Sequence, residues 1–175
     1  GLIAAELRDA GWASGALPLT LESFEQTVLM QLRALGIPGT YVYLLDAAGR
    51  AADLEARLGK DAPTYRAQLK PAGLAKLAGE VDGISVDRRI ILAPNKLGRA
   101  QGPTSLVADA HAVGLRVYVW TCRPENNFLV GEFKGRGGAG AFGDYEAEWA
   151  LIRDSGVDGV FVDHPDLGVA FFREG

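Results

Sequence analysis

The chain has 175 residues, of which 48% are apolar and 23% charged, so it is long enough for one domain with its own core and is neither disordered nor fibrous. Its net charge of −4 and its lack of a basic block argue against non-specific nucleic-acid binding, which depends on clustered Lys and Arg. No apolar run approaches the ~18 residues of a membrane span. The single cysteine, Cys122, excludes an internal disulfide framework and a cysteine-based metal cluster.

The chain opens with a predicted helix over residues 2–10, whose apolar positions form one stripe. A first strand is predicted over 18–22, with proline at its start, where a missing N–H is tolerated. Ser23 and Gln26 then fit a capping box, in which the serine accepts from the third amide of the helix and the glutamine reaches back. These residues therefore predict a second helix directly after the strand.

A second strand is predicted over 41–45. The following stretch, 46–70, is charged and alanine-rich, and one helical turn is expected over 53–58. Pro71 at the first helical position begins the next helix, because its missing N–H is one of the unpaired amides there anyway. A third strand over 84–87 places an aspartate, Asp87, at its end.

A long loop is expected over 88–102, followed by a helix over 103–113. The fourth strand, 116–120, ends at a tryptophan. A third long loop, 121–143, follows it and contains the glycine-rich piece 135–143. That piece lacks the spacing of a phosphate-binding loop and is expected to be a mobile lid or a disordered loop.

Asp144 is a plausible N-cap for a helix over 145–155. A fifth strand follows over 159–163, and Asp166 is expected to cap the last helix. Together the five strands alternate with helices, and no segment indicates a second domain.

The loops of the predicted fold are asymmetric, since every long loop follows a strand and every loop from a helix into a strand is short. This asymmetry is typical of a TIM barrel, in which the loops after the strands build the site at one face. The stretch 46–70 would then be an excursion over the barrel mouth. Five units do not close a barrel of eight, however, and a doubly wound open sheet fits the same pattern.

Two motifs at the fourth and fifth strands resemble the C-terminal end of the glycerophosphodiester phosphodiesterase family, a group of TIM-barrel hydrolases. Further similarity extends over most of the chain, at 21–24, 69–71 and 82–87, and points to the periplasmic-type branch. The resemblance implies that residues 1–175 are the C-terminal part of a single barrel domain, supplying strands four to eight. The residues that carry the two motifs are Trp120, Thr121, Gly156, Val157, Asp158, Gly159, Asp163, Pro165 and Asp166.

The resemblance also implies a chemistry: metal-dependent hydrolysis of small-molecule glycerophosphodiesters to glycerol 3-phosphate and an alcohol. The family's acid/base histidines and most ligands of its divalent cation, Mg²⁺ or Ca²⁺, belong to H-R-G, E-x-D, H-D and E-x-K motifs at the first three strands of the barrel, in the half that the resemblance leaves outside this chain. We therefore expect an inactive fragment that supplies pocket wall. Its partner would be the missing N-terminal half or a second copy. The compartment is not indicated.

Four residues at strand ends are the predicted substrate-binding residues, on the family's pattern: Glu22, Phe24, Asp87 and Trp120. The indole of Trp120 would give a rigid apolar wall for the glycerol or alcohol moiety, although a core role is the alternative. Glu22 could orient a glycerol hydroxyl, or it could simply be a polar residue at a strand end. Asp87 could form a carboxylate site with Asp163.

For the other chemically active side chains, structural or solvated roles are expected. Asp82 and Asp158 precede strands in Asp-Gly turns and are expected to be turn residues on the opposite, stability face. His164 has no visible partner, which favours a structural or solvated role. Asp163 is expected to fix the turn into the last helix. Cys122 lies near the rim, with nothing close in sequence to lower its pKa.

Two alternatives to the phosphodiesterase interpretation stay open at this point. The strands over 18–22 and 159–163 would be unpaired edges with apolar faces, which invites pairing with another chain and suggests a non-catalytic half-barrel for binding or assembly. Another phosphate-handling barrel, such as a sphingomyelinase-type phospholipase D, would share the same fold.

Overall fold

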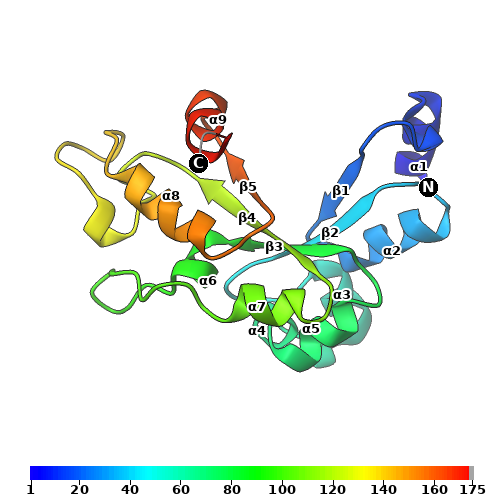
Figure 1. The fold of residues 1–175 in the computed structure, drawn as a ribbon. Coiled ribbons are helices and arrows are strands. Elements are labelled where there is room, and N and C mark those ends of the chain that lie inside the picture. The colour runs from blue at the N-terminus through cyan, green and yellow to red at the C-terminus, as the bar shows by residue number, and fades with distance from the viewer. Residues whose placement is uncertain (174–175) are drawn as a thin grey trace. The chain divides into compact units, whose positions relative to one another are not determined.

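The structure, a computed structural model, describes residues 1–173 as an α/β chain with five strands (Figure 1). The strands are β1 Thr20–Ser23, β2 Thr40–Leu45, β3 Gly83–Asp87, β4 Arg116–Cys122 and β5 Gly159–Val162. The helices are α1 Leu2–Asp9, α2 Gln26–Ala34, α3 Ala52–Leu58, α4 Tyr65–Gln68, α5 Pro71–Leu77, α6 Arg88–Leu92, α7 Leu106–His111, α8 Tyr145–Asp154 and α9 Pro165–Arg173. Short 3₁₀ helices occupy Trp12–Ser14, Gly59–Asp61 and Gly131–Phe133.

The strands are hydrogen-bonded in the order β1-β2-β3-β4-β5, so each is a neighbour of the strand before and after it in the chain. The β1–β2 and β4–β5 pairs are parallel, and helices connect the successive strands. Parallel neighbours in chain order are the arrangement of consecutive units of a TIM barrel. The fold is therefore α/β, as predicted, and is consistent with part of such a barrel. All five predicted strands are present, although β1 begins at Thr20 rather than at residue 18.

The two Asp-Gly turns have the same structural task, as the sequence indicated. The carboxylate of Asp82 accepts a hydrogen bond of 2.8 Å from the Tyr41 N–H, near the start of β2. The carboxylate of Asp158 accepts one of 2.7 Å from the Val117 N–H, near the start of β4. Each aspartate thus satisfies an amide at the beginning of a parallel strand that the sheet leaves unpaired.

The chain forms two compact units. The first unit consists of 1–85 and 109–116, and the second of 86–108 and 117 onward. In the first unit, α2 packs on β2 and α4 packs on α5, and these elements share a core of fully buried side chains because their apolar residues have helical and strand periods. The largest members of that core are Leu29, Tyr43, Leu45, Leu74, Leu77 and Ile84.

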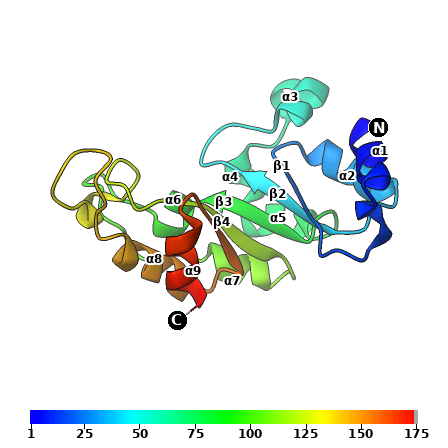
Figure 2. The same ribbon diagram turned by 90° about the horizontal axis from the view of Figure 1, so that it is seen from above.

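In the second unit, α8 and α9 lie side by side (Figure 2) and share an aromatic cluster. The indole of Trp149 is fully buried and stacks on Phe172 at 5.6 Å between ring centroids. Phe171 and Tyr145 meet the same indole edge-on, at 5.8 and 4.8 Å. Aromatic groups in these geometries contribute packing beyond their buried area, so this cluster anchors the last helix.

Two predicted helix starts are wrong. The capping box of Ser23 and Gln26 does not form, because α2 begins at Gln26 with Glu25 as its N-cap residue. The Ser23 hydroxyl instead accepts from the Glu25 N–H at 2.9 Å. At the other end of the chain, α9 begins at Pro165, so Asp166 lies in its first turn rather than capping it. In contrast, the predicted cap of α8 is confirmed, since Asp144 accepts from the Ala147 N–H.

The predicted loop 88–102 also begins differently from the expectation. A short helix, α6, follows β3 without any loop. Asp87 is both the last residue of the strand and the N-cap of this helix, accepting from the Arg89 N–H at 2.8 Å. The start of α6 was missed because the same residue, Asp87, ends β3 and caps the helix, so no turn residues separate the two elements.

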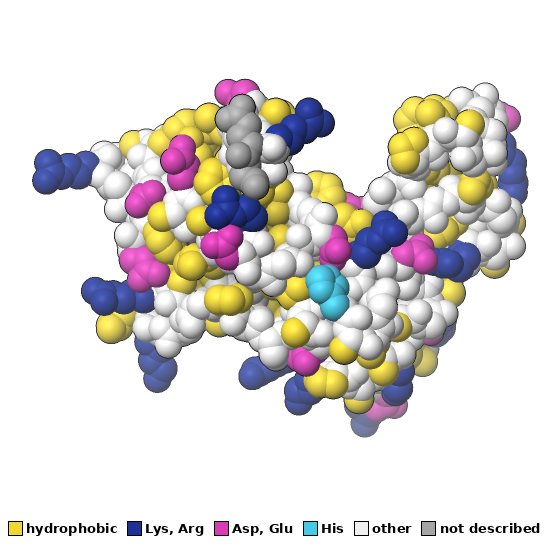
Figure 3. All heavy atoms as spheres, in the orientation of Figure 1, with side chains coloured by type: hydrophobic (Ala, Val, Ile, Leu, Met, Phe, Trp, Pro, Cys, Tyr) yellow, Lys and Arg dark blue, Asp and Glu magenta, His cyan; other side chains and the backbone are white. Residues whose placement is uncertain are grey.

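The surface bears out the mixed charge of the sequence. On the face drawn in Figure 3, basic and acidic side chains stand among apolar and uncharged ones, without a block of one sign. Among the helices of residues 1–173, none has the length and apolar character needed to cross a bilayer.

Candidate functional site

A cavity of about 380 Å³ in the second unit lies at the carboxyl ends of β3 and β4. Asp87 ends β3, and Trp120 lies near the end of β4, so two of the four predicted substrate-binding residues come together in one cavity. Arginine side chains dominate the rest of its polar lining. The lining residues are Asp87, Arg88, Arg89, Trp120, Thr121, Arg123, Asn127, Phe128 and Leu129.

Asp87 forms an ion pair with its neighbour Arg89. The guanidinium donates to both carboxylate oxygens, at 2.9 and 2.8 Å, in the bidentate geometry that suits this pair. Burial by itself would raise the pKa of Asp87. The hydrogen bonds from the Arg89 side chain and backbone, with the charges of Arg89 and Arg88, outweigh it and hold the pKa below its ordinary value of 3.8. Asp87 is therefore a carboxylate at neutral pH.

The lowered pKa of Asp87 predicts how the stability of the protein depends on pH in acid. A group whose pKa is lower folded than unfolded stabilises the fold above its unfolded pKa, and the stabilisation is lost as the pH falls through the folded value. Asp87→Asn keeps a capping side chain but removes the charge. Its deficit in unfolding free energy relative to wild type should be full near pH 6 and shrink below about pH 4.

Urea denaturation at a series of pH values measures that deficit, with Asp154→Asn at an exposed ion pair as the matched control. A deficit for Asp87→Asn that stays constant between pH 6 and pH 3 would contradict the assignment.

Arg88 forms an ion pair with a buried carboxylate on α8, that of Glu148. Glu148 accepts from Arg88 Nη1 at 2.6 Å with one oxygen and from the Val130 N–H at 2.7 Å with the other. The glutamate side chain is fully buried and that of Arg88 is 9% exposed. Burial raises the pKa of Glu148, while the Arg88 charge and the Val130 N–H act in the opposite direction. The pair joins α6, α8 and the 129–131 segment beside the cavity.

Arg123 is the third arginine of the cavity and follows the end of β4. Its Nε forms an ion pair with Asp163, which directly follows β5. Its guanidinium also lies over the ring of Phe128, 4.3 Å from the centroid. Asp163 was expected to fix the turn into α9, but its charge is directed to Arg123 instead. The two aspartates of the predicted carboxylate site, Asp87 and Asp163, are therefore each paired with an arginine.

His164 has a partner that the sequence did not reveal. Its Nε2 lies 3.0 Å from Glu125 Oε1, and Phe142 meets the imidazole edge-on at 5.4 Å. Burial by itself would raise the pKa of Glu125, but the hydrogen bond and charge of His164 outweigh it and lower that pKa. The only signal in the sequence was position, because Glu125 and His164 both follow the ends of neighbouring strands.

The glycine-rich piece 135–143 is tied down by one amide. Asn126 donates through Nδ2 to the carbonyls of Gly135 and Gly138 and accepts from the Gly135 N–H at 2.8 Å. A backbone bridge between Glu125 and Phe142 joins the same loop to the segment after β4. The sequence, which indicated a mobile lid or a disordered loop, gave no sign of these hydrogen bonds.

Cys122 is buried, and it is not a nucleophile of the rim. Burial, with the Glu148 charge, raises the pKa of its thiol to about 12. Because the thiolate is the reactive form, the side chain is inert at neutral pH.

Glu22 and Phe24 belong to the first unit and are not among the residues that line the cavity. Glu22 is half-buried in β1, and burial raises its pKa. Its Oε1 is buried with no hydrogen-bond partner among the described residues. The ring of Phe24 packs against Tyr65 at 6.5 Å. Their role in binding stays a prediction.

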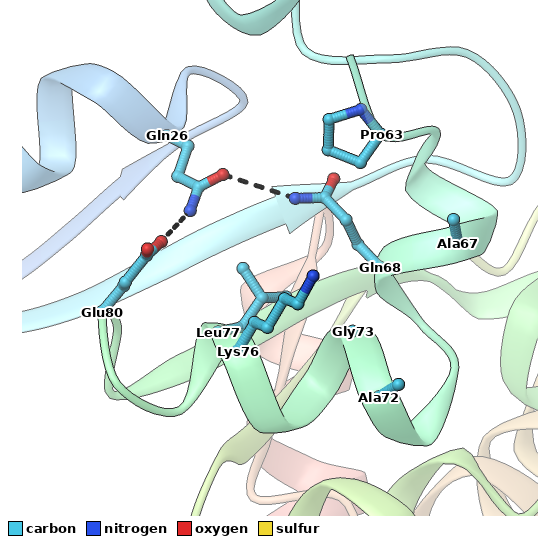
Figure 4. Close-up of a pocket in the computed structure, with 9 residues that line it drawn as sticks. All are labelled: Gln26, Pro63, Ala67, Gln68, Ala72, Gly73, Lys76, Leu77 and Glu80. Carbon is cyan, nitrogen blue, oxygen red and sulfur yellow. Dashed lines mark hydrogen bonds between the residues drawn. The ribbon is translucent and has the colours of Figure 1, made fainter. Parts of the chain in front are cut away.

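A second cavity, of about 300 Å³, lies in the first unit between α2, α4 and α5 (Figure 4). Gln26 reaches across it, donating to Glu80 and accepting from Gln68 Nε2 at 3.3 Å. Gln68 in turn accepts from the Tyr43 hydroxyl at 3.3 Å. The polar groups of this cavity mostly satisfy one another, which explains why Gln26 is not part of a capping box.

Within residues 1–173, no three His, Cys, Asp or Glu side chains gather in a way that could hold a metal ion. Asp87 and Asp163, the carboxylates at the ends of β3 and β5, are both engaged by arginines. The donor set of this part of the fold therefore suits anions better than a divalent cation.

The sequence pattern of the Glycerophosphoryl diester phosphodiesterase family matches residues 3–167. The chain belongs to this family. The family is the one that Trp120, Thr121 and the residues around β5 indicated.

A solved structure shares the fold: a Silicibacter pomeroyi DSS-3 protein named as a glycerophosphoryl diester phosphodiesterase, with a TM-score of 0.57 and 16% identity. The match covers 98% of this chain and 42% of that one, so this chain spans less than half the length of its relative. No curated protein matches. The position of the five strands within a glycerophosphoryl diester phosphodiesterase barrel, and the periplasmic-type branch, stay predictions.

Proposed function

We propose that this chain is the C-terminal part of a glycerophosphodiester phosphodiesterase and forms one wall of its substrate pocket. The complete enzyme would hydrolyse a glycerophosphodiester to glycerol 3-phosphate and an alcohol. Membership of the family supports the reaction class. The observation that carries the pocket is the cavity at the ends of β3 and β4, which Asp87 and Trp120 both line, because this is the end at which α/β barrels bind their substrates.

Each predicted residue has a distinct role in this proposal. Trp120 is the rigid apolar wall against which the carbon skeleton of the glycerol or the alcohol packs. Asp87 holds Arg89 in a fixed orientation beside it. For Glu22 and Phe24, which lie in the first unit and outside the lining of this cavity, the family's pattern supports a role in orienting a glycerol hydroxyl and in packing beside it.

The acid/base histidines and the cation ligands would be supplied by residues outside this chain. The family is generally metal-dependent, and a divalent cation such as Mg²⁺ or Ca²⁺ supplies charge stabilisation at the phosphate oxygens when bound. The contribution of residues 1–173 is positioning.

Replacing Trp120 in a chain extended upstream to carry the H-R-G and E-x-D motifs tests this role. Trp120→Ala should lower kcat/KM for a glycerophosphodiester by on the order of 10- to 100-fold, because the substrate loses its apolar wall. Trp12→Ala is the control, since that indole lies in the first unit and is 49% exposed. Its kcat/KM should equal that of wild type.

Hydrolysis of glycerophosphocholine in the presence of Mg²⁺ or Ca²⁺ is the readout. An equal loss of kcat/KM in both variants would contradict the assignment of Trp120 to the pocket. An extended chain that hydrolyses no diester would favour the alternative of a non-catalytic binding module. That alternative is supported by the positions of β1 and β5 at the two ends of the strand order and by the exposed Phe161 on β5.

A further inference from the structure

We propose that the cavity at β3 and β4 selects diesters whose alcohol moiety carries a second anionic group, such as a phosphate. This inference rests on the proposed function and specifies the substrate class of the same site. It starts from the charge of the lining, in which Arg88, Arg89 and Arg123 stand against a single carboxylate, Asp87.

The carboxylates near the cavity are already engaged by arginines. Both oxygens of Asp87 accept from Arg89. Glu148 is fully buried, does not line the cavity and uses one oxygen for Arg88 and the other for a backbone amide. Asp163, also outside the lining, pairs with Arg123. A ligand in the cavity therefore meets mainly donors.

The ion pairs orient the guanidiniums without using all their donors. A guanidinium carries five N–H groups in a planar fork that matches the oxygens of a phosphate or carboxylate. Arg123 pairs with Asp163 through Nε, and Arg88 pairs with Glu148 through Nη1. Because both side chains are held by their partners, an anion binds them without a large loss of side-chain freedom. Thr121 and Asn127 add neutral hydrogen-bonding groups to the same wall.

The cavity is poorly suited to a cationic alcohol such as choline. Quaternary ammonium groups are recognised by aromatic faces, and Phe128 and Trp120 are the aromatic residues of the lining. The guanidinium of Arg123 already covers the face of Phe128 at 4.3 Å. A choline would have to approach this like charge, whereas an anionic group would be attracted by it.

Calorimetric titration of the 175-residue chain with three diesters tests the inference. Glycerophosphoinositol 4-phosphate and glycerophosphoinositol form a matched pair that differs only in the second anionic group, and glycerophosphocholine is the cationic member. We expect the first to bind about tenfold or more tightly than either of the others. Arg123→Gln should reduce this preference to about twofold. Arg57→Gln, at an exposed position of α3 in the first unit, should leave it unchanged.

The outcomes separate this inference from the proposed function. Similar affinities for all three diesters in the wild-type chain overturn the selectivity and leave the pocket in place. Binding of none of them overturns the pocket itself. A preference that falls equally in Arg57→Gln is not specific to this cavity and overturns the assignment to it. The wild-type comparison does not depend on whether the Arg123 variant folds.

Discussion

Replacing Glu148 with leucine should lower the free energy of unfolding by about 3–5 kcal/mol, which is the cost of leaving a buried charge without its partner. The carboxylate is fully buried and contacts Arg88 at 2.6 Å. Arginine keeps its charge at every accessible pH, so the variant cannot relieve the loss by deprotonation. The Val130 N–H loses its acceptor as well, which adds a buried, unsatisfied donor.

Urea denaturation measures the effect, and α8 offers a matched control two residues earlier. Glu146→Leu makes the same substitution at an exposed position of the same helix and should change the free energy by no more than about 0.5 kcal/mol. The double variant Arg88→Met, Glu148→Leu should regain most of the lost stability, because no isolated charge remains. A single variant as stable as wild type, or a double variant no better than the single, would show that the pair is not desolvated.

Gly73→Ala should destabilise the protein by about 1–3 kcal/mol, although the same change usually stabilises a helix. Gly73 lies in the first turn of α5, beside the end of α4 (Figure 4). A Cβ there would stand 2.5 Å from the carbonyl oxygens of both Ala67 and Gln68. These are backbone atoms, which cannot move aside as the end of a flexible side chain can, so the two helices would have to separate.

Gly79→Ala is the control for this prediction, and thermal or urea unfolding is the measurement. The closest atom to a Cβ at Gly79 is the Lys76 carbonyl oxygen at 3.6 Å, an ordinary contact distance. That variant should be as stable as wild type or slightly more stable. If Gly73→Ala also matched or exceeded wild type, the close approach of α4 and α5 would be wrong.

Much of the fold could be predicted because its signals are local. The strands were found from β-branched and aromatic runs, and Pro71 and Asp144 marked the starts of α5 and α8. The starts of α2 and α9 were missed, since a capping residue is chosen by where the chain enters the helix. Gln26 has the right spacing for a capping box, but its amide is bonded to Gln68 on α4 and to Glu80 in the turn after α5.

The candidate site could be predicted only in part. Strand-end position was enough to select Asp87 and Trp120, which do line one cavity. It was not enough to find the arginines of that cavity, because charged side chains just after a strand are usually solvated and carry no periodic signal. His164 and Glu125 were likewise separate residues in the sequence until the ends of β4 and β5 brought them within 3.0 Å.

The sequence by itself determined the order of the five strands, the two Asp-Gly turns and the family, since each depends on short runs of neighbouring residues. Only the tertiary structure decided which charges meet. Arg88 and Glu148 are 60 positions apart and Glu125 and His164 are 39 apart. The physical reason is that backbone periodicity places a side chain on one face of its own element, whereas an ion pair depends on how two distant elements pack.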